Sequence, residues 1–117
     1  MRTLAAGPAA LEAYLNMSAA LGAGDLDAKL REQIALTVAQ ANSCEYCLSA
    51  HAAIGRMAGL QPEEIAASRQ ARSEDGKRQA GLQFAQAVVM ERGEVSDEAL
   101  ARVRAAGYTD GEIAEIV

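Results

Sequence analysis

The sequence is poor in aromatic residues and contains no long apolar run. Only 3% of its 117 residues are aromatic, with one Phe, three Tyr and no Trp, although 50% are hydrophobic. No stretch approaches the roughly 18 consecutive apolar residues of a membrane-spanning helix, which excludes a membrane protein. Ala supplies much of the apolar content, and small apolar residues favour helices, whereas strands are enriched in β-branched and aromatic residues. The composition therefore predicts an all-α fold.

Positive charge is also in short supply. Lys and Arg number 11 against 16 Asp and Glu, which gives a net charge of −5 and argues against a nucleic-acid partner or binding to an anionic membrane. The first residues, Met1–Leu4, do not open the apolar stretch of a signal peptide. We therefore expect a cytoplasmic protein. In that reducing compartment its two cysteines are expected to serve catalysis or metal binding rather than a structural disulfide.

Capping residues, prolines and glycines divide the chain into about six to seven helices, and no segment alternates with the period of a strand. The expected helix starts are Pro8, Asp25 or Asp27, Asn42, Pro62, Ser73, Ser96 and Thr109. The start at Asn42 resembles a capping box with Glu45, and its helix is expected to end at Gly59. A length of 117 residues fits one domain, so residues 1–117 are expected to form a single helical unit.

The last expected helix is unusually short. It is well capped at Thr109 and apolar, yet the chain ends after about two turns. Isolated helices need roughly 12–15 residues even to be marginally stable. We therefore expect this sequence to lack the C-terminal helices of a longer chain.

Both cysteines and the one histidine lie within a single short segment. Cys44 and Cys47 form a CxxC motif at an expected helix start, where free N–H groups and the helix dipole favour the thiolate. His51 follows Cys47 by four residues and Cys44 by seven, so the three side chains fall within about 60° of one another around the helix. Because the thiolate is the reactive form of cysteine, this pattern indicates thiol chemistry.

A carboxylate on the preceding helix completes the candidate site. That helix has two apolar sides, and Glu32 lies in the second of them, among Ala28, Ala35, Leu36 and Ala39. Burying a carboxylate there is unfavourable without a partner charge. In an antiparallel hairpin, Glu32 and His51 would lie roughly 13 and 12 Å from the turn, at about 1.5 Å per residue. We therefore predict a Glu32–His51–Cys47 relay, in which His51 takes the thiol proton and Glu32 orients the imidazole.

The spacing of these four residues resembles a known family signature. Glu32, eleven residues, Cys44-x-x-Cys47, three residues and His51 reproduce the E-x11-CxxC-x3-H pattern of the alkylhydroperoxidase-D-like branch of the carboxymuconolactone decarboxylase family. Residues 30–36, 40–44 and 108–113 are also similar to that family, and the resemblance runs from about residue 11 to the end. It differs in having Tyr46 where the founding enzyme has a second histidine, which bears on the strength of any peroxidase activity more than on the fold.

The resemblance implies a helical protein that assembles into dimers, trimers or hexamers through helix faces and reduces hydroperoxides without a bound cofactor. Cys47 would react with a small hydroperoxide, Cys44 would resolve the product to a disulfide, and Glu32 with His51 would relay protons. An external dithiol or a lipoylated protein would restore the thiols. In thioredoxin-type motifs the first cysteine attacks instead, so the CxxC motif alone leaves the order open, although His51 lies one turn from Cys47.

Other interpretations of the same residues remain open. The dithiol could be a redox sensor or a weak metal site in a helical oligomer, although zinc usually takes four Cys or His ligands and only three are present here. The cysteines could also be inert buried residues. Glu32 could be a solvated residue paired with Lys29. Lactone decarboxylation is disfavoured because the decarboxylase branch lacks the CxxC motif.

Overall fold

The computed structural model describes residues 2–117 and contains eight α-helices and no strand in that range. The helices are α1 (Arg2–Ala5), α2 (Pro8–Gly22), α3 (Ala28–Ala41), α4 (Glu45–Met57), α5 (Pro62–Ser68), α6 (Gly76–Met90), α7 (Asp97–Ala105) and α8 (Asp110–Ile116). The predicted all-α class is confirmed, and the short α1 is the helix that the sequence pattern did not indicate. None of these helices combines the length and apolarity needed to span a bilayer.

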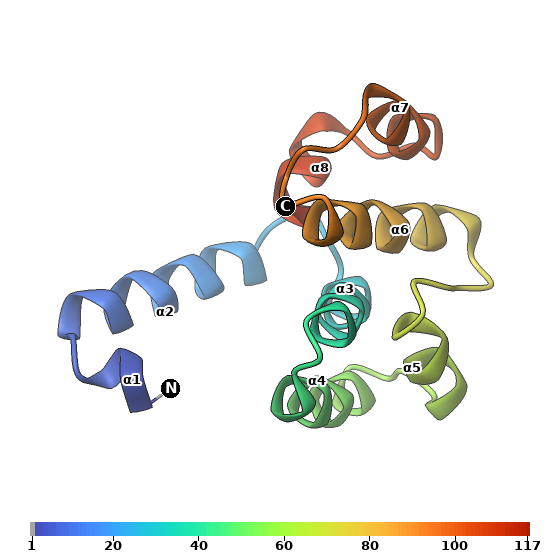
Figure 1. The fold of residues 1–117 in the computed structure, drawn as a ribbon. Coiled ribbons are helices and arrows are strands. Elements are labelled where there is room, and N and C mark those ends of the chain that lie inside the picture. The colour runs from blue at the N-terminus through green and yellow to red at the C-terminus, as the bar shows by residue number, and fades with distance from the viewer. Residues whose placement is uncertain (1) are drawn as a thin grey trace.

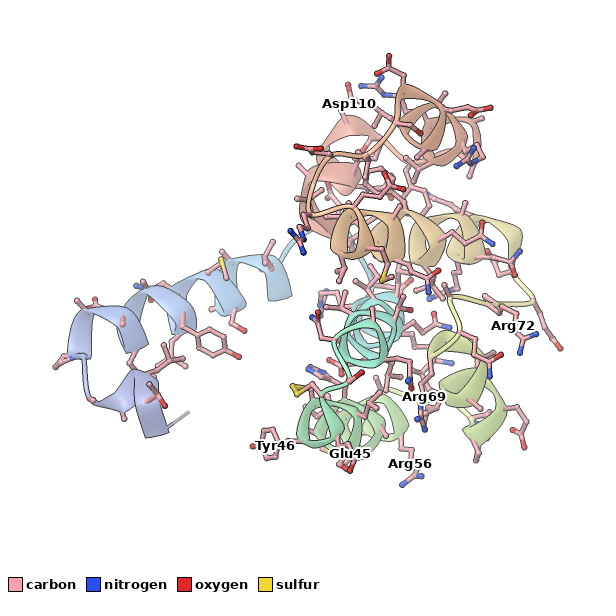
Figure 2. All side chains as sticks on the ribbon, viewed as in Figure 1. Glu45, Tyr46, Arg56, Arg69, Arg72 and Asp110 are labelled. Atoms are coloured by element: carbon pink, nitrogen blue, oxygen red, sulfur yellow. A yellow bond between two sulfur atoms is a disulfide. The ribbon has the colours of Figure 1, made fainter. Side chains whose placement is uncertain are left out.

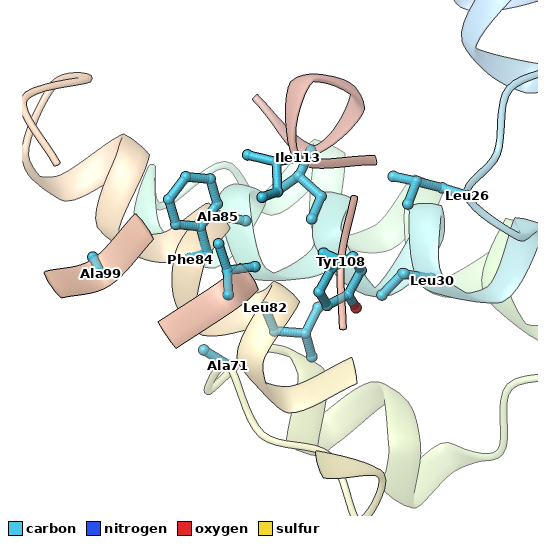
Figure 3. Packing of buried hydrophobic residues seen from close by; sticks show 11 residues of the cluster. Leu26, Leu30, Ala71, Leu82, Phe84, Ala85, Ala99, Tyr108 and Ile113 are labelled. Atoms are coloured by element: carbon cyan, nitrogen blue, oxygen red, sulfur yellow. The ribbon is translucent and has the colours of Figure 1, made fainter. Parts of the chain in front are cut away.

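Helix α3 lies at the centre of the arrangement. It packs most extensively on α4 and next on α6, with α5 beside α4 and with α7 and α8 beyond α6, whereas α1 and α2 project from this body as an arm (Figure 1). On one side of α3, Leu26 and Leu30 join a core cluster with residues of α6, α7 and α8, part of which Figure 3 shows. On the other side, Leu36 joins a second cluster with Leu60 and Ile65. The prediction that this helix has two apolar sides is therefore confirmed.

Polar contacts also tie α3 to its neighbours. The Thr37 hydroxyl, fully buried, lies 2.6 Å from the Ser68 carbonyl oxygen of α5. Asp27 caps α3 by accepting a hydrogen bond from the Leu30 N–H, and it pairs with Arg78 of α6 at 2.8 Å. Burial alone would raise the pKa of Asp27, but the Leu30 N–H and the Arg78 guanidinium outweigh burial and hold that pKa below its usual value. The cap predicted at Asp25 or Asp27 is thus Asp27.

The predicted helix starts at Pro8, Pro62, Ser96 and Thr109 are confirmed, but the start predicted at Ser73 is wrong. Asp75 caps α6 instead, because its carboxylate accepts the Arg78 N–H at 2.8 Å. The Ser73 hydroxyl accepts the Asp75 N–H and so closes the turn that precedes the helix. Ser73 therefore stabilises the turn before α6, and Asp75 is the N-cap.

A glycine of α6 makes room for the one buried tyrosine of the described chain. Tyr108 is 4% exposed, and a Cβ atom added at Gly81 would lie 2.5 Å from its hydroxyl oxygen. Burial raises the pKa of Tyr108 to about 12, so its phenol is neutral at physiological pH. The Lys77 ammonium lies 4.6 Å from the centre of the Tyr108 ring, a distance suited to a cation–π contact.

Gly81→Ala is therefore expected to lower the free energy of unfolding by about 1–3 kcal/mol, as overpacking of a core usually does. The loss should exceed the gain of about 1 kcal/mol that Ala brings to a helix interior. Gly76→Ala is the matched control, since nothing lies within 4 Å of a Cβ atom at that position. Urea unfolding of both variants measures the difference, and equal stability of the two would show that Tyr108 does not depend on the glycine.

Candidate functional site

The turn between α3 and α4 places the first cysteine. Helix α3 ends in a Schellman motif, in which the Ser43 N–H bonds to the Gln40 carbonyl and the Cys44 N–H bonds to the Ala39 carbonyl. Ser43 occupies the left-handed region, with φ of 53°. Asn42 is consequently the C-cap of α3, and the capping box predicted between Asn42 and Glu45 is wrong. A new helix can begin only after the left-handed residue.

Cys44 itself caps α4. Its sulfur accepts a hydrogen bond from the Cys47 backbone N–H at 3.3 Å, in the position that a serine or aspartate oxygen usually fills. Cys44 and Cys47 are joined by a disulfide, with their Cα atoms 5.3 Å apart. Both residues are partly exposed. The structure therefore holds the oxidised form of the pair, at the positive end of a helix and within reach of solvent.

Glu32 and His51 meet across the interface of α3 and α4. The Glu32 Oε2 atom lies 2.8 Å from His51 Nδ1. The side chains are 17% and 35% exposed, so the pair sits at the edge of the interface and not in its centre. The two residues lie at one level of the hairpin, as their similar predicted distances from the turn indicate.

Gly55 allows α4 to pack close to α3 at the level of Glu32, and the sequence analysis did not identify this glycine. It is buried one turn after His51, and a Cβ atom added to it would lie 3.7 Å from Glu32 Cβ and 2.9 Å from a methyl group of Leu60. The absence of a side chain at Gly55 thus lets α4 lie close to α3 at the level of Glu32. The available signal was a glycine four residues after the histidine, on the same face of the helix.

The contact between Glu32 and His51 determines which imidazole nitrogen is free to react. When the carboxylate accepts the Nδ1 proton, the neutral ring has its lone pair on Nε2, which can then exchange protons with a neighbouring group. Cys47 precedes His51 by one helical turn, so the two side chains share a face of α4. Cys44, Cys47 and His51 thus lie at the start and in the first half of α4, and Glu32 of α3 contacts His51, as the sequence predicts. Their assignment as catalytic residues stays a prediction.

The described residues contain no cluster of side chains suited to binding a metal ion. Within residues 2–117, no group of three or more His, Cys, Asp or Glu side chains is arranged to hold a metal ion. Three surface cavities, of about 190, 300 and 490 Å³, are lined by residues of α3, of α5 to α8 and of the segments that join them. None of the three is lined by Cys44, Cys47 or His51.

Fold and site together define an all-helical protein with a CxxC disulfide at a helix start and a Glu–His pair beside it. The chain belongs to the carboxymuconolactone decarboxylase family, whose sequence profile matches residues 8–88. The alkylhydroperoxidase-D-like branch lies within this family, so the motif resemblance and the profile agree.

A protein of Haemophilus influenzae, described as uncharacterized, is also similar. It is 54% identical over 46 residues, which are 38% of this chain and 41% of that protein. The match therefore spans about two fifths of the relative, whose description gives no activity.

Proposed function

We propose that this protein is a CxxC-dependent thiol peroxidase that reduces organic hydroperoxides through the Cys44–Cys47 pair. The observation that carries the proposal is the 2.8 Å contact between Glu32 and His51, one helical turn from Cys47. Family membership supports it at a coarser level, since the family includes enzymes and alkylhydroperoxidase-D-like peroxidases. The proposal places the reaction in the cytoplasm, where thiols are kept reduced.

In the oxidative half-reaction, His51 takes the Cys47 proton at Nε2 and the thiolate attacks the terminal oxygen of the hydroperoxide. The O–O bond breaks, two electrons pass from sulfur to oxygen, and the leaving alkoxide receives the proton from His51 to give an alcohol. Cys47 is left as a sulfenic acid. The Cys44 thiol then attacks that sulfur, forms the disulfide and releases water.

In the reductive half-reaction, a thiolate of an external dithiol attacks the Cys47 sulfur and Cys44 leaves as a thiolate. The Cys47 N–H that donates to the Cys44 sulfur, together with the helix dipole, stabilises this leaving group. The second thiol of the reductant then releases Cys47 and becomes part of a disulfide in the reductant. No bound cofactor is required, and either a small dithiol or a lipoylated protein could supply the electrons.

The proposal is tested by turnover of an organic hydroperoxide in the presence of excess small dithiol. We expect many equivalents of alcohol per chain. Oxidation that stops at one equivalent per chain and does not cycle would favour the redox-sensor alternative. Lactone decarboxylation that survives Cys47→Ser would favour the decarboxylase alternative.

A further inference from the structure

The largest of the three cavities lies apart from the candidate redox site. It has a volume of about 490 Å³ and lies between α3, α5 and the start of α6. Small-molecule sites usually have volumes of about 300–1,000 Å³ and a mostly apolar lining. This cavity has the volume of such a site but a polar lining, in which Ala67 is the one apolar residue. Its volume and lining therefore favour a small polar occupant.

Gln33 is the buried residue of this lining. It lies on α3 and is only 2% exposed. Its Oε1 atom accepts a hydrogen bond from Nη1 of Arg78 at 3.1 Å. Because a guanidinium can only donate, the amide oxygen must face Arg78, and the amide nitrogen must take the other position. The contact with Arg78 thus fixes the orientation of the amide.

The amide nitrogen of Gln33 has two N–H groups and no hydrogen-bond partner within residues 2–117. It is not sealed off, because the Tyr108 hydroxyl is the one fully enclosed side-chain polar atom in that range that lacks a partner. The nitrogen therefore borders the cavity that Gln33 lines. A buried amide donor is unfavourable unless it is hydrogen-bonded, so the cavity is suited to a ligand that supplies an acceptor.

Arg72 adds an unpaired positive charge to the same cavity. It lies on the segment that joins α5 to α6, on the side of the body away from the arm (Figure 2). Its guanidinium donates to the Gln70 side chain and forms no ion pair within residues 2–117. Arg78 differs from it, because Asp27 neutralises the Arg78 guanidinium at 2.8 Å. A carboxylate would satisfy both the Gln33 N–H groups and the Arg72 charge.

Negative charge in the lining disfavours a simple anion. Four carboxylates line the cavity against the two guanidiniums of Arg72 and Arg78, and they would repel a ligand that carried negative charge alone. Among the four, Glu74 is exposed and forms no ion pair within the described chain. A metal ion does not suit it, because no three His, Cys, Asp or Glu side chains of the described residues are arranged to hold one. The positive group that suits Glu74 is therefore an organic ammonium.

We propose that this cavity binds a small zwitterion of the amino-acid class, which carries one carboxylate and one ammonium group. The Gln33 N–H groups donate to the carboxylate, Arg72 pairs with it, and the Glu74 carboxylate accepts from the ammonium. The zwitterion thus satisfies the unused donor and both unpaired charges, whereas a ligand of single charge satisfies one end only. Cys44, Cys47 and His51 do not line the cavity, so the binding is independent of the proposed peroxidase function.

Calorimetric titration of the protein with matched compounds tests the proposal. Glycine, 4-aminobutanoate and 6-aminohexanoate carry both charges at increasing separation, whereas hexanoate and hexylammonium carry one charge each. We expect at least one zwitterion to bind, one per chain, at least about tenfold more tightly than either compound of single charge, as a charge-assisted hydrogen bond at each end requires. Failure of all three zwitterions to bind, or binding no tighter than that of hexanoate or hexylammonium, overturns the proposal.

Variants at the two ends of the site then locate the ligand. Gln33→Met keeps the volume of the side chain and removes the amide, so it should weaken binding of the preferred zwitterion at least about tenfold. Glu74→Gln should remove the advantage of that zwitterion over hexanoate.

Glu98→Gln is the matched control, an exposed carboxylate of α7 outside the cavity, and it should bind as the wild type does. Arg72→Gln changes an exposed residue and serves if Gln33→Met fails to fold, and it should weaken binding of the carboxylate end. Wild-type affinity in both Glu74→Gln and Arg72→Gln overturns the proposal. Because binding and not turnover is measured, the result holds whether or not the protein reduces hydroperoxides.

Discussion

Cys47→Ser is expected to abolish the reaction with hydroperoxide, by a factor of at least about 1,000, because it removes the thiol one helical turn from His51, which in the proposed mechanism supplies the electron pair that breaks the O–O bond. The remaining thiol of Cys44 lies on the N-cap of α4, where its sulfur accepts the residue-47 N–H and lies farther along the helix from His51. The measurement is the rate of thiol loss after addition of an organic hydroperoxide, with fully reduced protein at equal thiol concentration.

Cys44→Ser is the matched variant, and it separates the two orders of attack. If Cys47 attacks first, this variant still reacts once, and its sulfenic acid persists because the resolving thiol is gone. A reagent that traps sulfenic acids should then label the Cys44→Ser variant at Cys47 and leave the Cys47→Ser variant unlabelled. Labelling at Cys44 in the Cys47→Ser variant would assign the roles the other way, as in thioredoxin-type motifs.

Glu32→Gln and His51→Gln each lower the rate of thiol oxidation by about 100-fold to 10,000-fold, the usual contribution of a positioned proton-transfer group. His51→Gln removes the proton acceptor. Glu32→Gln keeps an oxygen at hydrogen-bond distance from Nδ1 but removes the negative charge that stabilises the imidazolium. The measurement is the single-turnover rate across a pH series, because loss of the relay should change the shape of the profile and not only its height.

Glu63→Gln is the control for this pair, since Glu63 is an exposed carboxylate of α5 away from the site. Its rate and pH profile should match those of the wild type. In the proposed mechanism Glu32 acts through His51, as a positioning residue. A Glu32→Gln variant with the wild-type rate and profile would mean that the Glu32–His51 contact serves only to hold α3 against α4.

The meeting of Glu32 and His51 could be predicted from the sequence because it depends on few variables. A helix rises by a fixed amount per residue, so a short turn between two antiparallel helices sets which residues share a level. The two apolar sides of α3 likewise follow from the helical period, and in the structure Leu30 belongs to one core cluster and Leu36 to the other.

The capping of α4 could not be predicted in the same way. Asn42 is a good capping residue, but the choice between ending one helix and starting the next depends on Ser43 adopting a left-handed conformation, which serine rarely does. Gly55 was missed for a related reason. A glycine within a helix ordinarily destabilises that helix. Gly55 is useful here because α3 packs against it, and the sequence does not show which helix lies opposite.

The arm shows the limit of pattern reasoning most clearly. The helix expected to start at Pro8 is α2, and its Leu11, Tyr14, Leu15, Ser18 and Leu21 share one face at helical spacing. Periodicity identifies a face that must be covered but does not identify what covers it. The structure adds that α2 makes no extensive contact within the described chain except that with α1.

The most direct test of the account is the number of free thiols per chain, counted on reduced wild-type protein before and after one equivalent of an organic hydroperoxide. The account predicts that both thiols, Cys44 and Cys47, are lost with formation of one equivalent of alcohol, and that a small dithiol restores both. Two thiols that remain free after the hydroperoxide is added would contradict it, and the Cys44–Cys47 pair would then have no part in peroxide chemistry.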